Sequence, residues 1–221
     1  MFDCFESKKT ISTGVSQWND LSGRAEHAVQ ATGSKQPTLN NKRGIFFTSS
    51  SLQTLETTTN FVFPEEYTAF TTFEMTGSGT GSNFPGISSH RAGTSEFVSN
   101  CAYVSSSSVI QGANSRSGES KTTSFISTSQ LNVNYTFTMR SSFSLDMMRS
   151  YNSGRHVSSN DNLSVWVTNN DTLSLGWIGT GSNYMDGYIK SFILYNRLLT
   201  EPMVHYVTRY LNNRFLVNKL M

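Results

Sequence analysis

The sequence contains few charged residues and no basic stripe. Asp, Glu, Lys and Arg make up 14% of its 221 residues, and the formal net charge is only +2. An average soluble protein has about 25% charged residues. The basic pairs Lys8-Lys9 and Lys42-Arg43 are isolated in the chain. Nucleic-acid binding is therefore disfavoured, because its affinity depends largely on clustered Lys and Arg at the phosphates.

Long apolar runs are also missing. No stretch approaches the ~20 apolar residues that cross a bilayer, so no membrane span is expected. The first residues lack the charged and apolar regions of a signal peptide, which predicts synthesis in the cytosol.

Cysteine is scarce, with only Cys4 and Cys101 in separate apolar runs. Free buried thiols are the default interpretation, and a disulfide stays open because bridging depends on the distance between the Cβ atoms. A domain of this length buries roughly 70% of the surface of its unfolded chain. Stability therefore requires no disulfide, metal or other cofactor.

Ser, Thr and Asn are abundant and must cover much of the surface. A surface of hydroxyls and amides suits exposed coats and glycan-facing proteins. Long loops alone would give the same composition, so both interpretations remain open.

An alternation of apolar and polar residues dominates up to Tyr195 and predicts an antiparallel sandwich. Residues 67–75, 135–139, 163–167 and 173–175 are expected to be half-buried strands, with one face mostly solvated. Residues 187–195 are apolar on both faces and predict a central strand. Its two predicted faces are Ile189, Ile193 and Tyr195 on one side and Tyr188, Phe192 and Leu194 on the other.

After Tyr195 the period changes to that of a helix. Val204, Val207, Leu211 and Phe215 recur at helical spacing, which predicts a helix over about residues 200–214. Thr200 is a natural N-cap, because its hydroxyl can accept a hydrogen bond from an amide of the first turn.

Motifs at both ends of the chain resemble concanavalin A-like lectin/glucanase domains of the laminin-G-like type. The first comprises Val-Ser-Gln-Trp-Asn-Asp-Leu-Ser-Gly at 15–23, with the strand at 44–47, and the second spans 186–200. Residues 67–70 and 134–137 are similar to the middle strands of the family. The resemblance implies an all-β fold, a single antiparallel β-sandwich (jelly roll) over residues 1–221 with one C-terminal α-helix. It departs from the family at residues 151–155, where the hairpin register stays open.

The sequence lacks the residues expected of catalysis on this fold. Glucanases that share it carry a Glu-x-Asp-x-x-Glu triad or a close variant on one strand, and the chain has none. The four histidines, His27, His90, His156 and His205, do not cluster, and no short ligand spacing predicts zinc. The sequence therefore predicts that the protein is not an enzyme and makes a glycoside hydrolase the weakest alternative.

Calcium is the one metal that the resemblance implies, since relatives hold it with loop carboxylates and carbonyls. Oxygen ligands are abundant near Asp161, Asp171 and Asp186. Asx residues also form turns without any metal, so calcium is expected as a possibility and not as a requirement.

The leading hypothesis is a non-catalytic, lectin-like recognition or adhesion module, with glycan as the ligand implied by the resemblance. Sugar binding needs an aromatic face together with amides or carboxylates. Three loop groups supply them: Asn183, Tyr184 and Asp186; Tyr151, Asn152 and Arg155; His90 and Arg91.

The alternative is a structural component of a virus or phage particle that binds other virion or surface proteins. The scarce charge, scarce cysteine and missing signal peptide motivate it. This hypothesis places the protein in a larger assembly or homo-oligomer, on a virion or an extracellular surface, where coat function and host attachment can coexist.

Overall fold

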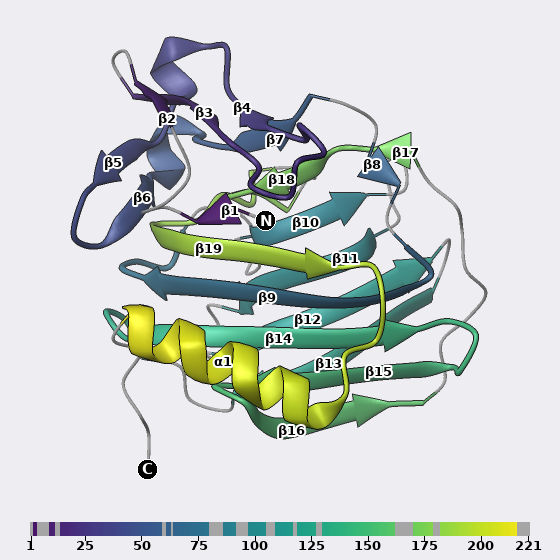
Figure 1. The fold of residues 1–221 in the computed structure, drawn as a ribbon. Coiled ribbons are helices and arrows are strands. Elements are labelled where there is room, and N and C mark those ends of the chain that lie inside the picture. The colour runs from purple at the N-terminus through teal and green to yellow at the C-terminus, as the bar shows by residue number, and fades with distance from the viewer. Residues whose placement is uncertain are drawn as a thin grey trace.

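Two antiparallel sheets stack face to face, and one helix lies across the outer face of the first sheet (Figure 1). The computed structural model describes residues 2–3, 9–11, 14–58, 61–62, 64–79, 86–91, 97–104, 109–116, 119–126, 130–161, 170–178 and 182–215. The predicted all-β sandwich with a C-terminal helix is confirmed.

The first sheet has eight strands. In spatial order they are β16 (Arg155–Asn160), β15 (Met147–Asn152), β14 (Asn134–Ser142), β9 (Glu66–Met75), β19 (Gly187–Tyr195), β6 (Gly44–Phe47) and β5 (Thr38–Asn40), with β1 (Phe2–Asp3) also paired to β19. The first strand of the chain pairs with the last strand in this sheet, because Phe2 pairs with Phe192.

The second sheet has nine strands. In spatial order they are β13 (Glu119–Ile126), β12 (Val109–Arg116), β11 (Phe97–Val104), β10 (Gly86–Arg91), β18 (Leu173–Leu175), β7 (Leu55–Thr57), β4 (Ala28–Val29), β3 (Val15–Trp18) and β2 (Lys9–Ile11). The remaining elements are a two-stranded ladder of β8 (Phe61–Val62) with β17 (Asn170–Asp171), two 3-10 turns, η1 (Gly33–Lys35) and η2 (Ser49–Ser51), and the helix α1 (Glu201–Phe215).

One hydrophobic cluster fills the space between the sheets and continues on the outer face of the first sheet beneath α1. Its largest members are aromatic, among them Trp18, Tyr67, Phe47, Phe70 and Phe73. The side chain of Trp18, from the first sequence motif, is fully buried, so this tryptophan is part of the core. Burial of apolar surface on this scale is the main force that holds the two sheets together.

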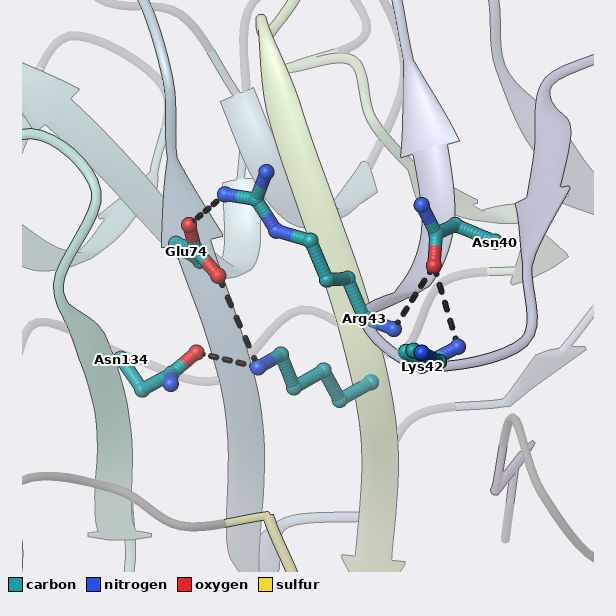
Figure 2. A network of polar contacts seen from close by, with 6 residues as sticks. Asn40, Lys42, Arg43, Glu74 and Asn134 are labelled. Carbon is teal, nitrogen blue, oxygen red and sulfur yellow. Dashed lines mark hydrogen bonds and ion pairs between the residues drawn. The ribbon is translucent and has the colours of Figure 1, made fainter.

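The predicted solvated faces of β9 and β14 are wrong, since both strands are buried on both sides. Thr68, Thr72, Thr136 and Thr138 point to the expected solvent face, yet their exposed fractions are zero. The helix α1 packs against β9 and β14 and covers part of this face. Arg43, Glu74 and Asn134 cover it near the other end of β9, together with Lys190 (Figure 2).

Strand β19 is buried on both faces, as its sequence predicted, but the assignment of side chains to faces is partly wrong. The register shifts between Ile189 and Ser191, which is a β-bulge at Lys190. After the bulge, Phe192 and Leu194 share the core face with Ile189, while Ile193 and Tyr195 face the helix side. A bulge adds one residue to a strand and exchanges the faces beyond it.

The helix begins where the sequence predicted, one residue after Thr200. The carbonyl of Thr200 accepts the first helical hydrogen bond, from the amide of Val204 at 2.9 Å. The loop before the helix is fixed by Thr68 of β9. Its Oγ1 accepts a bond from the amide of Leu199 at 2.9 Å and donates one to the carbonyl of Arg197 at 3.1 Å.

The first sequence motif ends in a tight turn. The amide of Ser22 donates to Oδ1 of Asp20 at 2.9 Å, and Gly23 adopts a positive φ of 81°. Glycine pays no steric penalty in that conformation. The strand predicted at 44–47 is β6, and residues 15–18 of the first motif form β3.

Some predictions fall on residues that the structure does not describe. The strand expected at 163–167, the residue Cys4 and the side chain of Cys101 lie outside the described residues. The state of the two thiols therefore stays a prediction. No helix in the described ranges is long and apolar enough to cross a membrane.

Candidate functional site

The group formed by His90 and Arg91 is not a loop site. Both residues belong to strand β10, and His90 lies between the sheets with an exposed fraction of zero. Ser88, two residues earlier on the same face, has its Oγ 3.5 Å from Oγ1 of Thr71 in the opposite sheet. The expected loop position of His90 is therefore wrong, and its role in ligand binding stays a prediction. The side chain of Arg91 lies outside the described ones.

The group at residues 151–155 closes the β15–β16 hairpin. Asn152 pairs with Arg155 across the turn, which fixes the register that the sequence left open. Tyr151 is buried beneath the first turn of α1, with an exposed fraction of 1%. Its hydroxyl accepts a bond from Arg140 at 2.8 Å and donates one to Glu201 at 3.3 Å. Tyr151 is therefore a buried packing residue and does not present its ring to a ligand, whereas Arg155 is exposed.

In the third group, Asp186 has a clear structural role. Its Oδ1 accepts a bond from the amide of Ser49 at 2.7 Å, and its Oδ2 accepts one from the hydroxyl of Ser49 at 2.8 Å. The carbonyl of Asp186 also accepts the amides of Thr76 and Gly77. Asp186 thus holds three distant segments together, and its carboxylate is occupied by Ser49.

Tyr184 lies in a different environment, where it forms an aromatic pair with Trp177. The two ring centroids are 5.6 Å apart and the ring planes differ by 11°, which is a stacked arrangement. A backbone bridge joins Trp177 to Tyr184, and their neighbours Ile178 and Met185 are buried. Alternation along the two short segments therefore turns both rings away from the core, and both remain partly exposed.

A carboxylate of strand β7 acts on Tyr184 through its charge. Glu56 of β7 is partly exposed, whereas its neighbours Leu55 and Thr57 are buried, so Glu56 points away from the core on the nine-stranded sheet. Burial raises the pKa of Tyr184, and the Glu56 carboxylate raises it further. The Tyr184 hydroxyl therefore stays protonated near neutral pH and is available as a hydrogen-bond donor and acceptor.

The position of the pair depends on a close backbone approach at Gly86. The amide of Gly86 donates to the carbonyl of Asn183 at 3.1 Å, and the same carbonyl accepts the amide of Ile178 at 3.3 Å. A Cβ atom at Gly86 would lie 2.2 Å from the nitrogen of Ile178 and 2.5 Å from the carbonyl carbon of Trp177. Only glycine permits this approach, which joins strand β10 to the segment that carries Trp177.

The candidate site is therefore the aromatic pair with its carboxylate: Trp177, Tyr184 and Glu56. The sequence identified Tyr184 but missed the other two residues. Trp177 precedes, and Tyr184 follows, the Gly/Ser-containing stretch 179–183, so an aromatic residue on each side of this stretch was an available signal. Glu56 had no such signal, because its place depends on the pairing of β7 with β18.

The described residues do not assemble the expected calcium site. They contain no group of three or more His, Cys, Asp or Glu side chains that could hold a metal ion. Both carboxylate oxygens of Asp186 bond to Ser49, Asp161 is exposed beyond the end of β16, and the side chain of Asp171 is not among the described ones. Calcium binding stays a prediction from the family resemblance.

Solved structures with a similar fold come from several kinds of protein. A heptameric pentraxin of Limulus polyphemus matches with a TM-score of 0.55 and 16% identity over 78% of this chain and 78% of the pentraxin chain. The carbohydrate-binding module CBM40 of a Ruminococcus gnavus sialidase, bound to α2,3-sialyllactose, matches with a TM-score of 0.55 and 12% identity over 76% of this chain and 97% of the module. Neither a protein-family model nor a curated protein sequence matches the chain.

An enzyme is also among the similar structures. A Trypanosoma rangeli sialidase matches with a TM-score of 0.64 and 12% identity over 91% of this chain but only 32% of the enzyme. These similarities establish the concanavalin A-like lectin/glucanase fold that the sequence motifs indicated. At these identities they establish the fold alone, and a fold by itself does not determine activity.

Proposed function

We propose that the protein is a non-catalytic glycan-recognition module and that the stacked pair of Trp177 and Tyr184 is its sugar-binding surface. The observation that carries the proposal is the partly exposed, parallel pair of rings that turns away from the core. An aromatic surface of this kind packs against the apolar C–H face of a sugar ring.

Polar groups beside the rings would fix the orientation of the sugar. The Glu56 carboxylate accepts hydrogen bonds from sugar hydroxyls, and the protonated Tyr184 hydroxyl can donate or accept them. The Glu56 carboxylate adds to the effect of burial in raising the pKa of the tyrosine. A single carboxylate at the surface suits binding, because glycoside hydrolysis commonly requires two carboxyl groups.

A screen of the purified protein against an array of glycans tests the proposal. We include α2,3-sialyllactose, because the structurally similar CBM40 is bound to it. We expect binding to at least one glycan class and its loss in Trp177→Ala. Glycan binding that is unchanged in both Trp177→Ala and Tyr184→Ala would show that the sugar binds elsewhere on the protein. Cleavage of a bound glycan would show that the protein is an enzyme.

The role as a virion component remains the alternative that the sequence raised. The similar structures include a heptameric pentraxin and a binding module of a sialidase, so they favour neither an assembly nor a single chain. Stable homo-oligomers of the purified protein without glycan binding would favour the structural role.

A further inference from the structure

A row of side chains crosses five neighbouring strands of the nine-stranded sheet, beginning at the segment that carries Trp177 (Figure 1). Each member of the row is paired with the next one in the adjacent strand. Side chains of directly paired residues lie on the same face of a sheet. We call this set the cross-strand row, and its members are Ser89 of β10, Ser174 of β18, Glu56 of β7, Val29 of β4 and Gln17 of β3.

The cross-strand row points away from the core. The residues next to its members along the strands are buried in the interior, among them Trp18, Ala28, Leu55 and Leu175. Successive side chains of a strand point to opposite faces, so the row lies on the outer face of the sheet. Trp177 and Tyr184 also turn away from the core.

One end of the row is covered by the segment that carries Trp177. The hydroxyl of Ser89 donates to the carbonyl of Ile178, the residue after Trp177, at 3.0 Å. Ser174 precedes Trp177 by three residues, so the chain between them spans at most about 11 Å. Ser89 and Ser174 are accordingly buried, with exposed fractions of 1% and 2%.

The rest of the row is open to solvent. Glu56, Val29 and Gln17 are partly exposed, and Glu56 is the direct neighbour of the covered Ser174. Neighbouring strands lie about 4.8 Å apart, so the open part from Glu56 to Gln17 is about 10 Å long. The open part therefore begins where the cover by the Trp177 segment ends.

The open part offers a polar, an apolar and a polar group in sequence. The carboxylate of Glu56 accepts hydrogen bonds from hydroxyls, and the amide of Gln17 can donate and accept them. A bond from Nε2 of Gln17 to Oδ1 of Asn19 at 2.7 Å orients this amide. Val29 lies between the two and supplies apolar surface for the C–H groups of a sugar. This arrangement suits a sugar chain that lies across the strands.

We infer that the ligand is a linear oligosaccharide, bound from the ring pair across the strands to Gln17, and not a single terminal sugar. Trp177 and Tyr184 hold one sugar, and Glu56, Val29 and Gln17 hold the sugars that follow it. The inference rests on the glycan-binding function proposed above and names the class of glycan.

Calorimetric titration with shortened forms of one glycan tests this inference. The probes are the glycan that binds best on the array and the trisaccharides, disaccharides and monosaccharides made by trimming it from either end. We expect the best trisaccharide to bind about tenfold or more tightly than the best monosaccharide, because each added sugar gains hydrogen bonds. Equal affinity of the two would overturn the inference and leave the proposed function intact. Absence of binding to every glycan of the array would overturn both.

Variants test whether the row supplies this gain. Gln17→Ala should lower the ratio of trisaccharide to monosaccharide affinity by about fivefold. Val29→Arg should also lower it, because an arginine directly opposite Glu56 pairs with its carboxylate and covers the row. Asn213→Ala is the matched control, since it removes an exposed amide on α1, which covers the other sheet, and it should leave the ratio unchanged.

Trp177→Ala separates the two proposals, because it should weaken the binding of fragments of every length. An unchanged ratio in both Gln17→Ala and Val29→Arg would overturn the inference, even where Trp177→Ala has lost all binding, since that loss supports the ring pair alone.

Discussion

Nζ of Lys190 lies 3.6 Å from Oε2 of Glu74, and the two side chains are only 5% and 6% exposed. Glu74 also bonds to Arg43, and Lys190 bonds to Asn134 (Figure 2). The hydrogen bond to Glu74 raises the pKa of Arg43, and its guanidinium lies 4.3 Å from the centre of the Tyr188 ring. The β-bulge at Lys190 places these charges on the outer face of the sheet, where one carboxylate serves two cations.

This arrangement predicts unequal costs for removing its members. Glu74→Gln leaves the buried ammonium of Lys190 without a counter-charge and should lower the free energy of unfolding by about 3–5 kcal/mol. Lys190→Met should cost only about 1–3 kcal/mol, because Glu74 keeps Arg43. Urea unfolding measures both values. The exposed Glu65→Gln is the control and should change stability by less than about 0.5 kcal/mol. Equal stability of Glu74→Gln and the unmodified protein would contradict this account.

A second prediction concerns two threonines on the same outer face of the first sheet. Thr68→Val removes both hydrogen bonds to the loop before α1 and leaves the amide of Leu199 unpaired, so it should cost about 1–3 kcal/mol. Thr138→Val, in contrast, removes a buried hydroxyl that has no partner among the described residues and should be neutral or stabilising. Thermal unfolding of both variants measures the two effects. A larger loss of stability in Thr138→Val than in Thr68→Val would contradict this prediction.

The tyrosines predict how stability changes at high pH. Burial raises the pKa of Tyr184 and of Tyr195 above the ordinary value of 10.0. The folded protein therefore holds these protons more tightly than the unfolded chain does. Their contribution is complete below about pH 10 and is lost as the pH rises through the folded-state values. Between about pH 8 and pH 11 the free energy of unfolding should decline less in Tyr184→Phe than in the unmodified protein. An equal decline in the two proteins would show that Tyr184 does not contribute to the pH dependence.

A fourth prediction tests the backbone approach that holds Trp177. Gly86→Ala introduces a clash and should cost about 1–3 kcal/mol. It should also change the near-ultraviolet circular dichroism of the stacked rings. Gly23→Ala is the control. A Cβ atom at Gly23 has open space around it, so this substitution only strains the backbone at its positive φ and clashes with no neighbour. An unchanged aromatic signal in Gly86→Ala would show that the approach does not position Trp177.

The sandwich, its central strand and its helix could be predicted from the sequence, because alternation and helical spacing are local patterns. It could not predict that Thr136 and Thr138 would be buried, since no local pattern shows where α1 packs. The bulge at Lys190 likewise changed the faces of Ile193 and Tyr195 without a sequence signal. Of the proposed sugar site, Tyr184 was predicted and Glu56 was not, because sheet pairing brings residues together that are distant in the chain. The virion or surface location and the oligomeric state stay predictions.

The proposal that Trp177 and Tyr184 form a glycan-binding surface is tested most directly by one calorimetric titration. The ligand is the best glycan from the array, and the proteins are the unmodified chain, Trp177→Ala and Tyr206→Ala. Tyr206 is the matched control, because it is 77% exposed on α1, which covers the other sheet. We predict about tenfold or greater loss of affinity in Trp177→Ala and no change in Tyr206→Ala. Equal affinity of Trp177→Ala and the unmodified protein would contradict the account.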